Sequence, residues 1–228
     1  MKRHWKTKVI EAAKGFAKFG GTAIALYWVL SQTDLDSLYR KLLNSDPAYL
    51  LLALLVFLVS QLFASSRIHL FFKAISLNLS AAYNFKLYLL GMFYNMFLPG
   101  GVAGDGYKIF LLKKYFGVAT KKLVVAKLLD KLSGFLSLAF LALSLLLFSR
   151  MLEVPSLLIL LIILFGIGSY YLMYKKFLPV FAPYFIKTHI RALGLQGSQI
   201  ICAMFILKSL GYPGPYIPYL VIFTISSR

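Results

Sequence analysis

The chain has 228 residues, of which 60% are hydrophobic and 14% charged, and its formal net charge is +18. A soluble domain is about a quarter charged, so this composition, with a mean hydropathy of +0.79, excludes a water-soluble globular protein. The basic residues are spaced out between apolar runs instead of forming one patch, which argues against nucleic acid as a partner.

Long runs without charged side chains predict an all-α integral membrane protein with about five to six transmembrane helices. A helix needs about 20 apolar residues to cross the hydrocarbon core, and lysines at its ends can extend to the interface. A basic amphipathic lead-in, 1–18, is predicted to precede a single membrane domain, 19–228. The predicted spans are 19–33, 47–66, 132–149, 154–174, 192–207 and a partial span at 216–228.

The distribution of lysine and arginine predicts which loops face the cytoplasm, because cytoplasmic loops collect basic residues. The segments that connect the spans alternate between the two sides of the membrane. Those assigned to one side hold 20 basic residues, whereas those assigned to the other side hold four. We therefore predict a plasma (inner) membrane protein with a cytoplasmic N-terminus, whose basic face contacts anionic lipid headgroups. The segments predicted inside are 1–18, 67–86, 108–131 and 175–191, and those predicted outside are 34–46 and 209–215.

The apolar segment 87–107 does not fit an ordinary span. Both of its flanks are rich in lysine, so the charge rule places both on the same side of the membrane. Pro99 and the glycines that follow it disfavour a continuous helix, and such backbone is tolerated at membrane depth only when protein or water covers it. We predict a re-entrant hairpin that turns at the Pro-Gly stretch, followed by cytoplasmic amphipathic helices in 108–131.

The Pro-Gly stretch lacks the features of two soluble phosphate-binding motifs. No Lys-Ser/Thr pair follows Gly106, as a P-loop requires, and the spacing after Gly104 does not match a dinucleotide-binding fingerprint. The run from Tyr94 to Lys108, YNMFLPGGVAGDGYK, instead resembles the pattern F-N-x-hydrophobic-P-G-x-x-G-G-D/E-x-x-R. That pattern belongs to the lysylphosphatidylglycerol synthase transmembrane region, a family of flippase-like multi-pass membrane proteins.

The resemblance extends to flanking segments and covers roughly residues 45–228. Arg67 stands at a helix end, a basic helix ends at Gly117, and Asp130-Lys131 stands where the family has an acid–arginine pair. Three positions depart from the pattern: Ala103 replaces a glycine, and Lys108 and Lys131 replace arginines, so that phosphate would meet point charges instead of bidentate forks. The family has a second broken segment, so we expect the chain to be truncated at its C-terminus.

The resemblance implies a lipid-binding site around the Pro-Gly turn. Its predicted members are Asn95, Pro99, Gly100, Gly101, Gly104, Asp105, Lys108, Asp130 and Lys131. Two of these residues also have structural interpretations: Asp105 as a helix cap, and Asn95 as a partner for backbone groups freed by Pro99. Lys108 either holds a lipid phosphate or extends to the interface. Adjacent residues on a helix do not face each other, so Asp130 and Lys131 are each expected to pair elsewhere.

The resemblance implies a flippase-like transporter for a phospholipid of the aminoacyl-phosphatidylglycerol kind or for a polyprenyl-phosphate-linked lipid. Two alternatives stay open: a membrane-embedded subunit of a lipid-modifying enzyme, and a non-catalytic assembly protein. We expect no enzyme activity, because the chain shows no catalytic constellation and no soluble aminoacyltransferase domain. No metal or cofactor is expected, since the histidines have no ligand spacing. Membrane lipids are the expected partners, and a homo-oligomer is left open.

Overall fold

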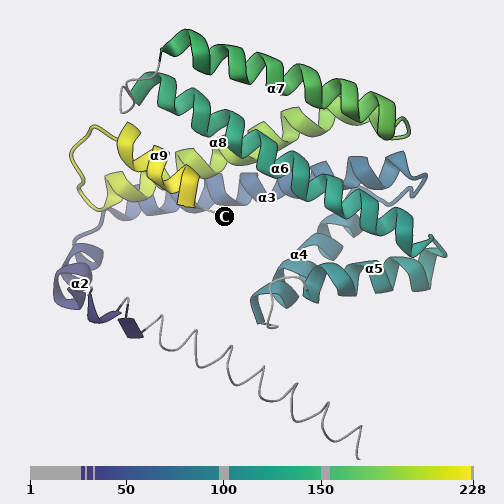
Figure 1. Cartoon of the computed structure of the whole chain (residues 1–228). Helices are drawn as coiled ribbons and strands as arrows, with labels where there is room; N and C mark the ends of the chain where they lie inside the picture. The colour runs from purple at the N-terminus through teal and green to yellow at the C-terminus, as the bar shows by residue number, and fades with distance from the viewer. Residues whose placement is uncertain (1–26, 29, 33, 98–102, 150–154, 227–228) are drawn as a thin grey trace, which may run out of the picture. The chain divides into compact units, whose positions relative to one another are not determined.

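The computed structural model describes residues 27–28, 30–32, 34–97, 103–149 and 155–226, and in this part of the chain it contains helices and no strand (Figure 1). The chain divides into two compact units, 1–45 and 46–228. In the first unit, α2 (Leu35–Leu43) is capped by Asp34, whose side chain accepts a hydrogen bond from the Ser37 amide. The predicted lead-in and most of the predicted span 19–33 lie outside the described residues.

The second unit confirms the predicted class, an all-α membrane protein. Four of its described helices are long and apolar enough to cross a membrane. They are α3 (Pro47–Ala74), α6 (Thr120–Ser149), α7 (Ser156–Phe177) and α8 (Phe185–Ser209). A 3₁₀ turn, η1 (Ala182–Tyr184), precedes α8, and α9 (Ile217–Ser226) has ten residues and packs against α6 and α8.

Local sequence explains where α3 begins. Asp46 caps α3, because its Oδ1 accepts a hydrogen bond of 2.8 Å from the Ala48 amide, and Pro47 fits the first helical position. Proline is tolerated there because the first-turn amides have no intrahelical partner.

Along α7, large apolar side chains such as Leu161 and Phe165 are exposed, as expected for a helix that is solvated by lipid on most sides.

Two helices start earlier in the chain than the spans predicted for them. α6 starts at Thr120 instead of residue 132, so 120–131 continues directly into the span. No proline or glycine interrupts residues 120–133, and the charged groups of Lys127 and Asp130 pair inside the protein instead of marking the interface. α8 starts at Phe185 instead of residue 192. Charge was therefore a poor guide to these helix ends.

The segment around the Pro-Gly stretch forms two helices, α4 (Ala81–Phe97) and α5 (Ala103–Phe116), which pack side by side (Figure 1). Residues 98–102, which include the predicted turn, lie outside the described residues. α5 ends at Phe116, and Gly117 follows with φ +66, a conformation that glycine adopts without steric cost. The described part of 87–107 is thus helical on both sides of the Pro-Gly stretch.

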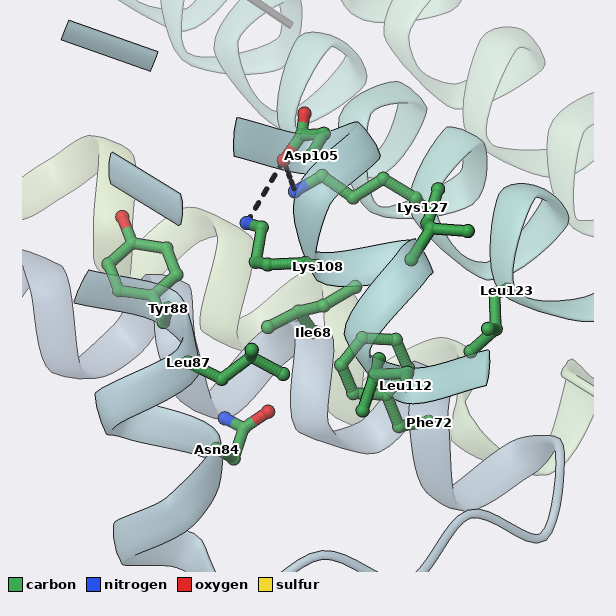
Figure 2. A pocket seen from close by; sticks show the side chains of 11 residues that line it. Ile68, Phe72, Asn84, Leu87, Tyr88, Asp105, Lys108, Leu112, Leu123 and Lys127 are labelled. Carbon is green, nitrogen blue, oxygen red and sulfur yellow. Dashed lines mark ion pairs between the residues drawn. The ribbon is translucent and has the colours of Figure 1, made fainter. Parts of the chain in front are cut away.

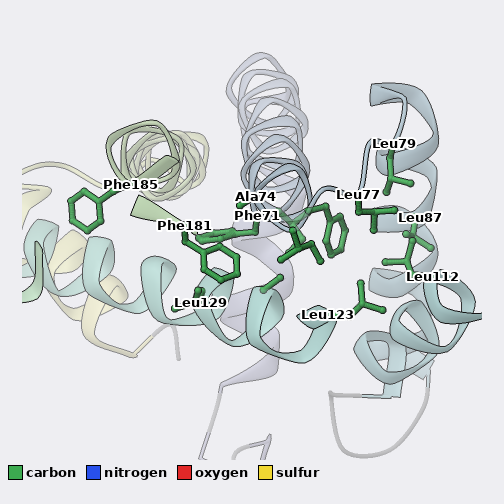
Figure 3. Packing of buried hydrophobic residues seen from close by; sticks show 14 of the residues in the cluster. Phe71, Ala74, Leu77, Leu79, Leu87, Leu112, Leu123, Leu129, Phe181 and Phe185 are labelled. Atoms are coloured by element: carbon green, nitrogen blue, oxygen red, sulfur yellow. The ribbon is translucent and has the colours of Figure 1, made fainter. Parts of the chain in front are cut away.

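The hydrophobic core lies at one end of the second unit, where α4 and α5 meet the longer helices (Figure 1). Phe71, Leu112 and Leu123, from α3, α5 and α6, are completely buried there (Figure 3). The cluster joins parts of 67–86, 108–131 and 175–191, three segments that the charge rule assigns to the same side of the membrane. Its buried members are Ile68, Phe71, Phe72, Ala74, Ile75, Leu77, Leu79, Leu87, Leu112, Leu123, Ala126, Leu129, Tyr174, Phe181 and Phe185.

Candidate functional site

The first turn of α5 is held against α4 by Asn95. The Asn95 Oδ1 accepts a hydrogen bond of 2.8 Å from the Gly104 amide, one of the first-turn donors that have no intrahelical partner. Asn95 was predicted either to belong to a lipid-binding site or to be a partner for backbone groups. In the structure it is a partner for a backbone amide at the start of α5. This bond sets the position of Asp105 and Lys108, which follow directly on the same helix.

Two glycines allow α4 and α5 to approach closely. A Cβ atom added to Gly104 would overlap the Gly91 carbonyl on α4, and one added to Gly91 would overlap the Lys108 side chain. The missing side chain of Gly91 therefore leaves the space through which Lys108 runs. Gly104 in turn lets the start of α5 lie directly against the α4 backbone.

Substituting Gly104 with alanine is expected to lower the free energy of unfolding by about 1–3 kcal/mol, because the new methyl group meets backbone that cannot move aside. Gly106→Ala on the same helix is the matched control, since a Cβ there meets nothing within 4 Å. Chemical unfolding of the purified chain in detergent measures both effects. Equal stability of the two variants would contradict the close approach.

Asp105 lies among three lysines from two helices, and Figure 2 shows two of them, Lys108 and Lys127. Its Oδ1 lies 3.0 Å from the Lys108 Nζ and 3.3 Å from the Lys127 Nζ, and its Oδ2 lies 3.0 Å from the Lys131 Nζ. Lys108 belongs to α5, whereas Lys127 and Lys131 are four residues apart on α6 and so lie on one face of that helix. This carboxylate thus ties the start of α5 to the start of α6.

A second carboxylate, Asp130, extends the ion pairs to α3. Its Oδ1 accepts a hydrogen bond of 2.8 Å from the Arg67 Nε, and its Oδ2 lies 2.9 Å from the Lys127 Nζ. As predicted, Asp130 and its neighbour Lys131 do not pair with each other but with different partners, Arg67 and Asp105. Lys127 joins both carboxylates and completes a continuous set of ion pairs across α3, α5 and α6.

We call this set the charge cluster; its members are Arg67, Asp105, Lys108, Lys127, Asp130 and Lys131. Four cations meet two carboxylates, so the charge cluster has two positive charges in excess. Asp130 and Asp105 are only 4% and 5% exposed. The Arg67 Nη1 is buried without a hydrogen-bond partner among the described residues. Each cation contacts a carboxylate, but the two excess positive charges are uncompensated, and uncompensated charge in a buried site is costly, so the excess favours an anion that completes the site.

Electrostatics keeps the start of α5 charged. Burial alone would raise the pKa of Asp105, but Lys127 and Lys108 outweigh it and lower that pKa from 3.8 to about 2. Burial and the nearby Lys127 lower the pKa of Lys108, whereas Asp105 opposes that change. Burial raises the pKa of the Tyr88 hydroxyl. Asp105 therefore remains an anion at neutral pH and competes with any other anion for the lysines.

Polar side chains of α3 and α4 continue from the charge cluster into the core. The Tyr88 hydroxyl donates a hydrogen bond of 2.8 Å to the Gln61 Oε1, and the Lys108 Nζ lies 5.7 Å from the Tyr88 ring centre. Asn84 donates to the Ser65 carbonyl at 2.7 Å. A cavity of about 10 Å³ lies beside Lys108 and Asp105, close to the volume that one water molecule needs (Figure 2).

The structure brings together four of the residues predicted from the sequence, Asp105, Lys108, Asp130 and Lys131. Gly104 directly precedes Asp105 and donates its amide hydrogen bond to Asn95. Pro99, Gly100 and Gly101 lie outside the described residues. The site predicted from the sequence did not include Lys127 or Arg67, and Arg67 was noted only as a residue at a helix end. The spacing of Lys127, three residues before Asp130 and four before Lys131, was a usable signal, because such residues share a helix face.

A second cavity, of about 310 Å³, lies between α6, α7 and α8. Its lining is almost entirely apolar, apart from Ser137, Tyr170 and His189. The His189 Nδ1 donates to the Phe185 carbonyl at 2.7 Å, which leaves its Nε2 as an acceptor. That Nε2 and the Tyr170 hydroxyl are buried without hydrogen-bond partners among the described residues. We call this space the apolar cavity.

The fold and the site define the class of the protein: a multi-pass α-helical membrane protein whose described helices enclose a cation-rich charge cluster. The described residues contain no group of three or more His, Cys, Asp or Glu side chains placed to hold a metal ion. A model of the lysylphosphatidylglycerol synthase transmembrane region matches residues 15–227, and the chain belongs to this family of lipid-related membrane proteins. No curated protein and no solved structure matches the chain.

Proposed function

We propose that the chain is a flippase-like lipid transporter in which the charge cluster binds the phosphate of a lipid headgroup. The observation that carries this proposal is the excess of two positive charges in a mostly buried site. A ligand can reach the charge cluster at Lys131, because the Lys131 side chain is 46% exposed whereas that of Asp105 is 6% exposed. Membership of the family supports a lipid as the ligand, either an aminoacyl phospholipid or a polyprenyl-phosphate-linked lipid.

The proposed topology places the charge cluster at the cytoplasmic side of the plasma membrane. Arg67, α5 and the start of α6 belong to segments that hold most of the basic residues. These segments share the hydrophobic core at one end of the second unit, which supports a common side. On this topology α4 and α5 enter from the cytoplasm as a re-entrant hairpin.

The apolar cavity is a suitable place for a hydrocarbon chain of the same lipid. It lies about two turns along α6 from Asp130, because Ser137 follows seven residues later. Apolar cavities of about 150 Å³ bind a benzene molecule, so about 310 Å³ has room for a segment of lipid chain. The Tyr170 hydroxyl could donate a hydrogen bond to an ester or hydroxyl oxygen of that lipid.

Transport is tested by reconstituting the purified chain in liposomes and measuring transbilayer movement of a fluorescent phospholipid. We expect Lys131→Gln to reduce the rate by about tenfold or more, since a hydrogen bond to a charged phosphate contributes about 1.5–3 kcal/mol. Lys113→Gln removes an equal charge from the exposed side of α5 and serves as the matched control. Absence of protein-dependent movement, or equal rates for the two variants, would contradict the proposal.

Filling the apolar cavity tests the chain-binding part of the proposal. Gly166 lines the cavity, and a Cβ added there meets nothing within 4 Å, so Gly166→Phe is expected to fill the space and reduce lipid binding about tenfold. Gly168→Phe is the control on α7, because Gly168 also has open space and does not line the cavity. Binding of a fluorescent phospholipid to both variants in nanodiscs measures the effect; equal affinities would contradict it.

A further inference from the structure

We infer, on the basis of the function proposed above, that the charge cluster selects a lipid phosphomonoester over a phosphodiester and over an aminoacylated headgroup. The argument begins with charge. The charge cluster has four cations and two carboxylates, Asp105 and Asp130, that contact them. Two positive charges are therefore not balanced by a carboxylate. A phosphomonoester carries about −1.5 to −2 at neutral pH and matches this excess. A phosphodiester carries one negative charge and leaves one cation uncompensated.

The two carboxylates are already occupied, which disfavours a headgroup that carries ammonium groups. Asp105 contacts three lysines, and Asp130 contacts Arg67 and Lys127. In the described part of 46–228 the remaining acid is Asp46, which caps the opposite end of α3, about 30 Å along the helix from Arg67. A lysyl group would therefore bring positive charge to a site with excess positive charge and no free carboxylate.

The unused donors of the charge cluster also suit three phosphate oxygens better than one or two. The Arg67 Nη1 is buried and has no hydrogen-bond partner among the described residues. The Lys131 ammonium lies at the open side, and its side chain is 46% exposed. A terminal phosphate offers three strong acceptor oxygens, so it can take the place of Asp105 beside several lysines while that carboxylate moves aside. A phosphodiester has only two unesterified oxygens.

The test is competition for the purified full chain in nanodiscs against a fluorescent phosphatidate. Competitors with identical dioleoyl chains are phosphatidate, phosphatidylglycerol and lysylphosphatidylglycerol, and inorganic phosphate is the soluble competitor. We expect phosphatidate to bind about tenfold or more tightly than phosphatidylglycerol, and the lysyl lipid to bind most weakly, because each added positive charge lies near the same cations. Lys131→Gln should narrow the difference between the first two lipids, whereas the control Lys113→Gln should preserve it.

Equal affinities for the three lipids, or tightest binding of the lysyl lipid, would overturn the inferred selectivity. Neither result would contradict the proposed transport. Binding of inorganic phosphate as tight as that of phosphatidate would show a site for soluble phosphate and would overturn the inference as well. Selective binding of phosphatidate by a chain that moves no lipid in liposomes would refute the proposed transport and leave the inferred selectivity standing. Melting temperatures of both variants confirm that each is folded.

Discussion

Asp130→Asn is expected to lower the free energy of unfolding by about 3–5 kcal/mol, because it removes the carboxylate from a buried ion pair and leaves Arg67 uncompensated. Asp130 is 4% exposed and Arg67 is 6% exposed, so water cannot replace the lost contact. Lys127 retains Asp105 and is affected less. Unfolding of the purified chain by denaturant in detergent, followed by circular dichroism, measures the change.

A double substitution separates the ion pair from simple damage to the core. Arg67→Met with Asp130→Leu replaces both charges by apolar groups of similar size, which often costs little in a buried site. We expect the double variant to be more stable than either single variant, with a coupling energy of about 0.5–3 kcal/mol. Asp36→Asn on the exposed α2 is the control and should change stability by less than about 1 kcal/mol. Additive effects of the two substitutions would contradict a direct pair.

The class of the protein could be predicted from the sequence because lipid imposes a simple rule on it: long uncharged runs become helices. The positions of helix ends were less predictable, since a charged residue was taken as a sign of the interface. α6 contradicts that assumption, because Lys127 and Asp130 lie within the helix and pair inside the protein. Buried ion pairs allow charges to lie where hydropathy alone predicts a loop or an interface.

The sequence predicted those residues of the site that lie close together along the chain, but not the contacts between residues that are distant in the sequence. Asp105 and Lys108 are three residues apart on one helix, and a proline-glycine break marks their neighbourhood, so both could be named in advance. The partner of Asp130 could not, because Arg67 is 63 residues away and meets it only through the packing of α3 against α6. The close contact of Gly91 with Lys108 likewise depends on how α4 and α5 pack together, which no spacing reveals.

Asp105→Asn is expected to destabilise the free protein and to strengthen its binding of a lipid phosphate. Without the carboxylate, Lys108, Lys127 and Lys131 repel one another and the excess rises from two positive charges to three. We expect a loss of about 3–5 kcal/mol in stability without ligand. Saturating phosphatidate should raise the melting temperature of the variant more than that of the wild type, because the phosphate no longer competes with Asp105.

The pH dependence of this difference follows from the pKa of Asp105, which the surrounding lysines lower from 3.8 to about 2. A carboxylate with a lowered pKa stabilises the folded state above its unfolded pKa, and this contribution is lost as the pH falls through the folded value. Wild type and Asp105→Asn should therefore differ by a constant amount between about pH 5 and 8 and converge as the pH falls from about 4 to 2. Melting curves of both proteins without lipid measure the difference. A gap that closes near neutral pH would show that another group, and not Asp105, holds the three lysines together.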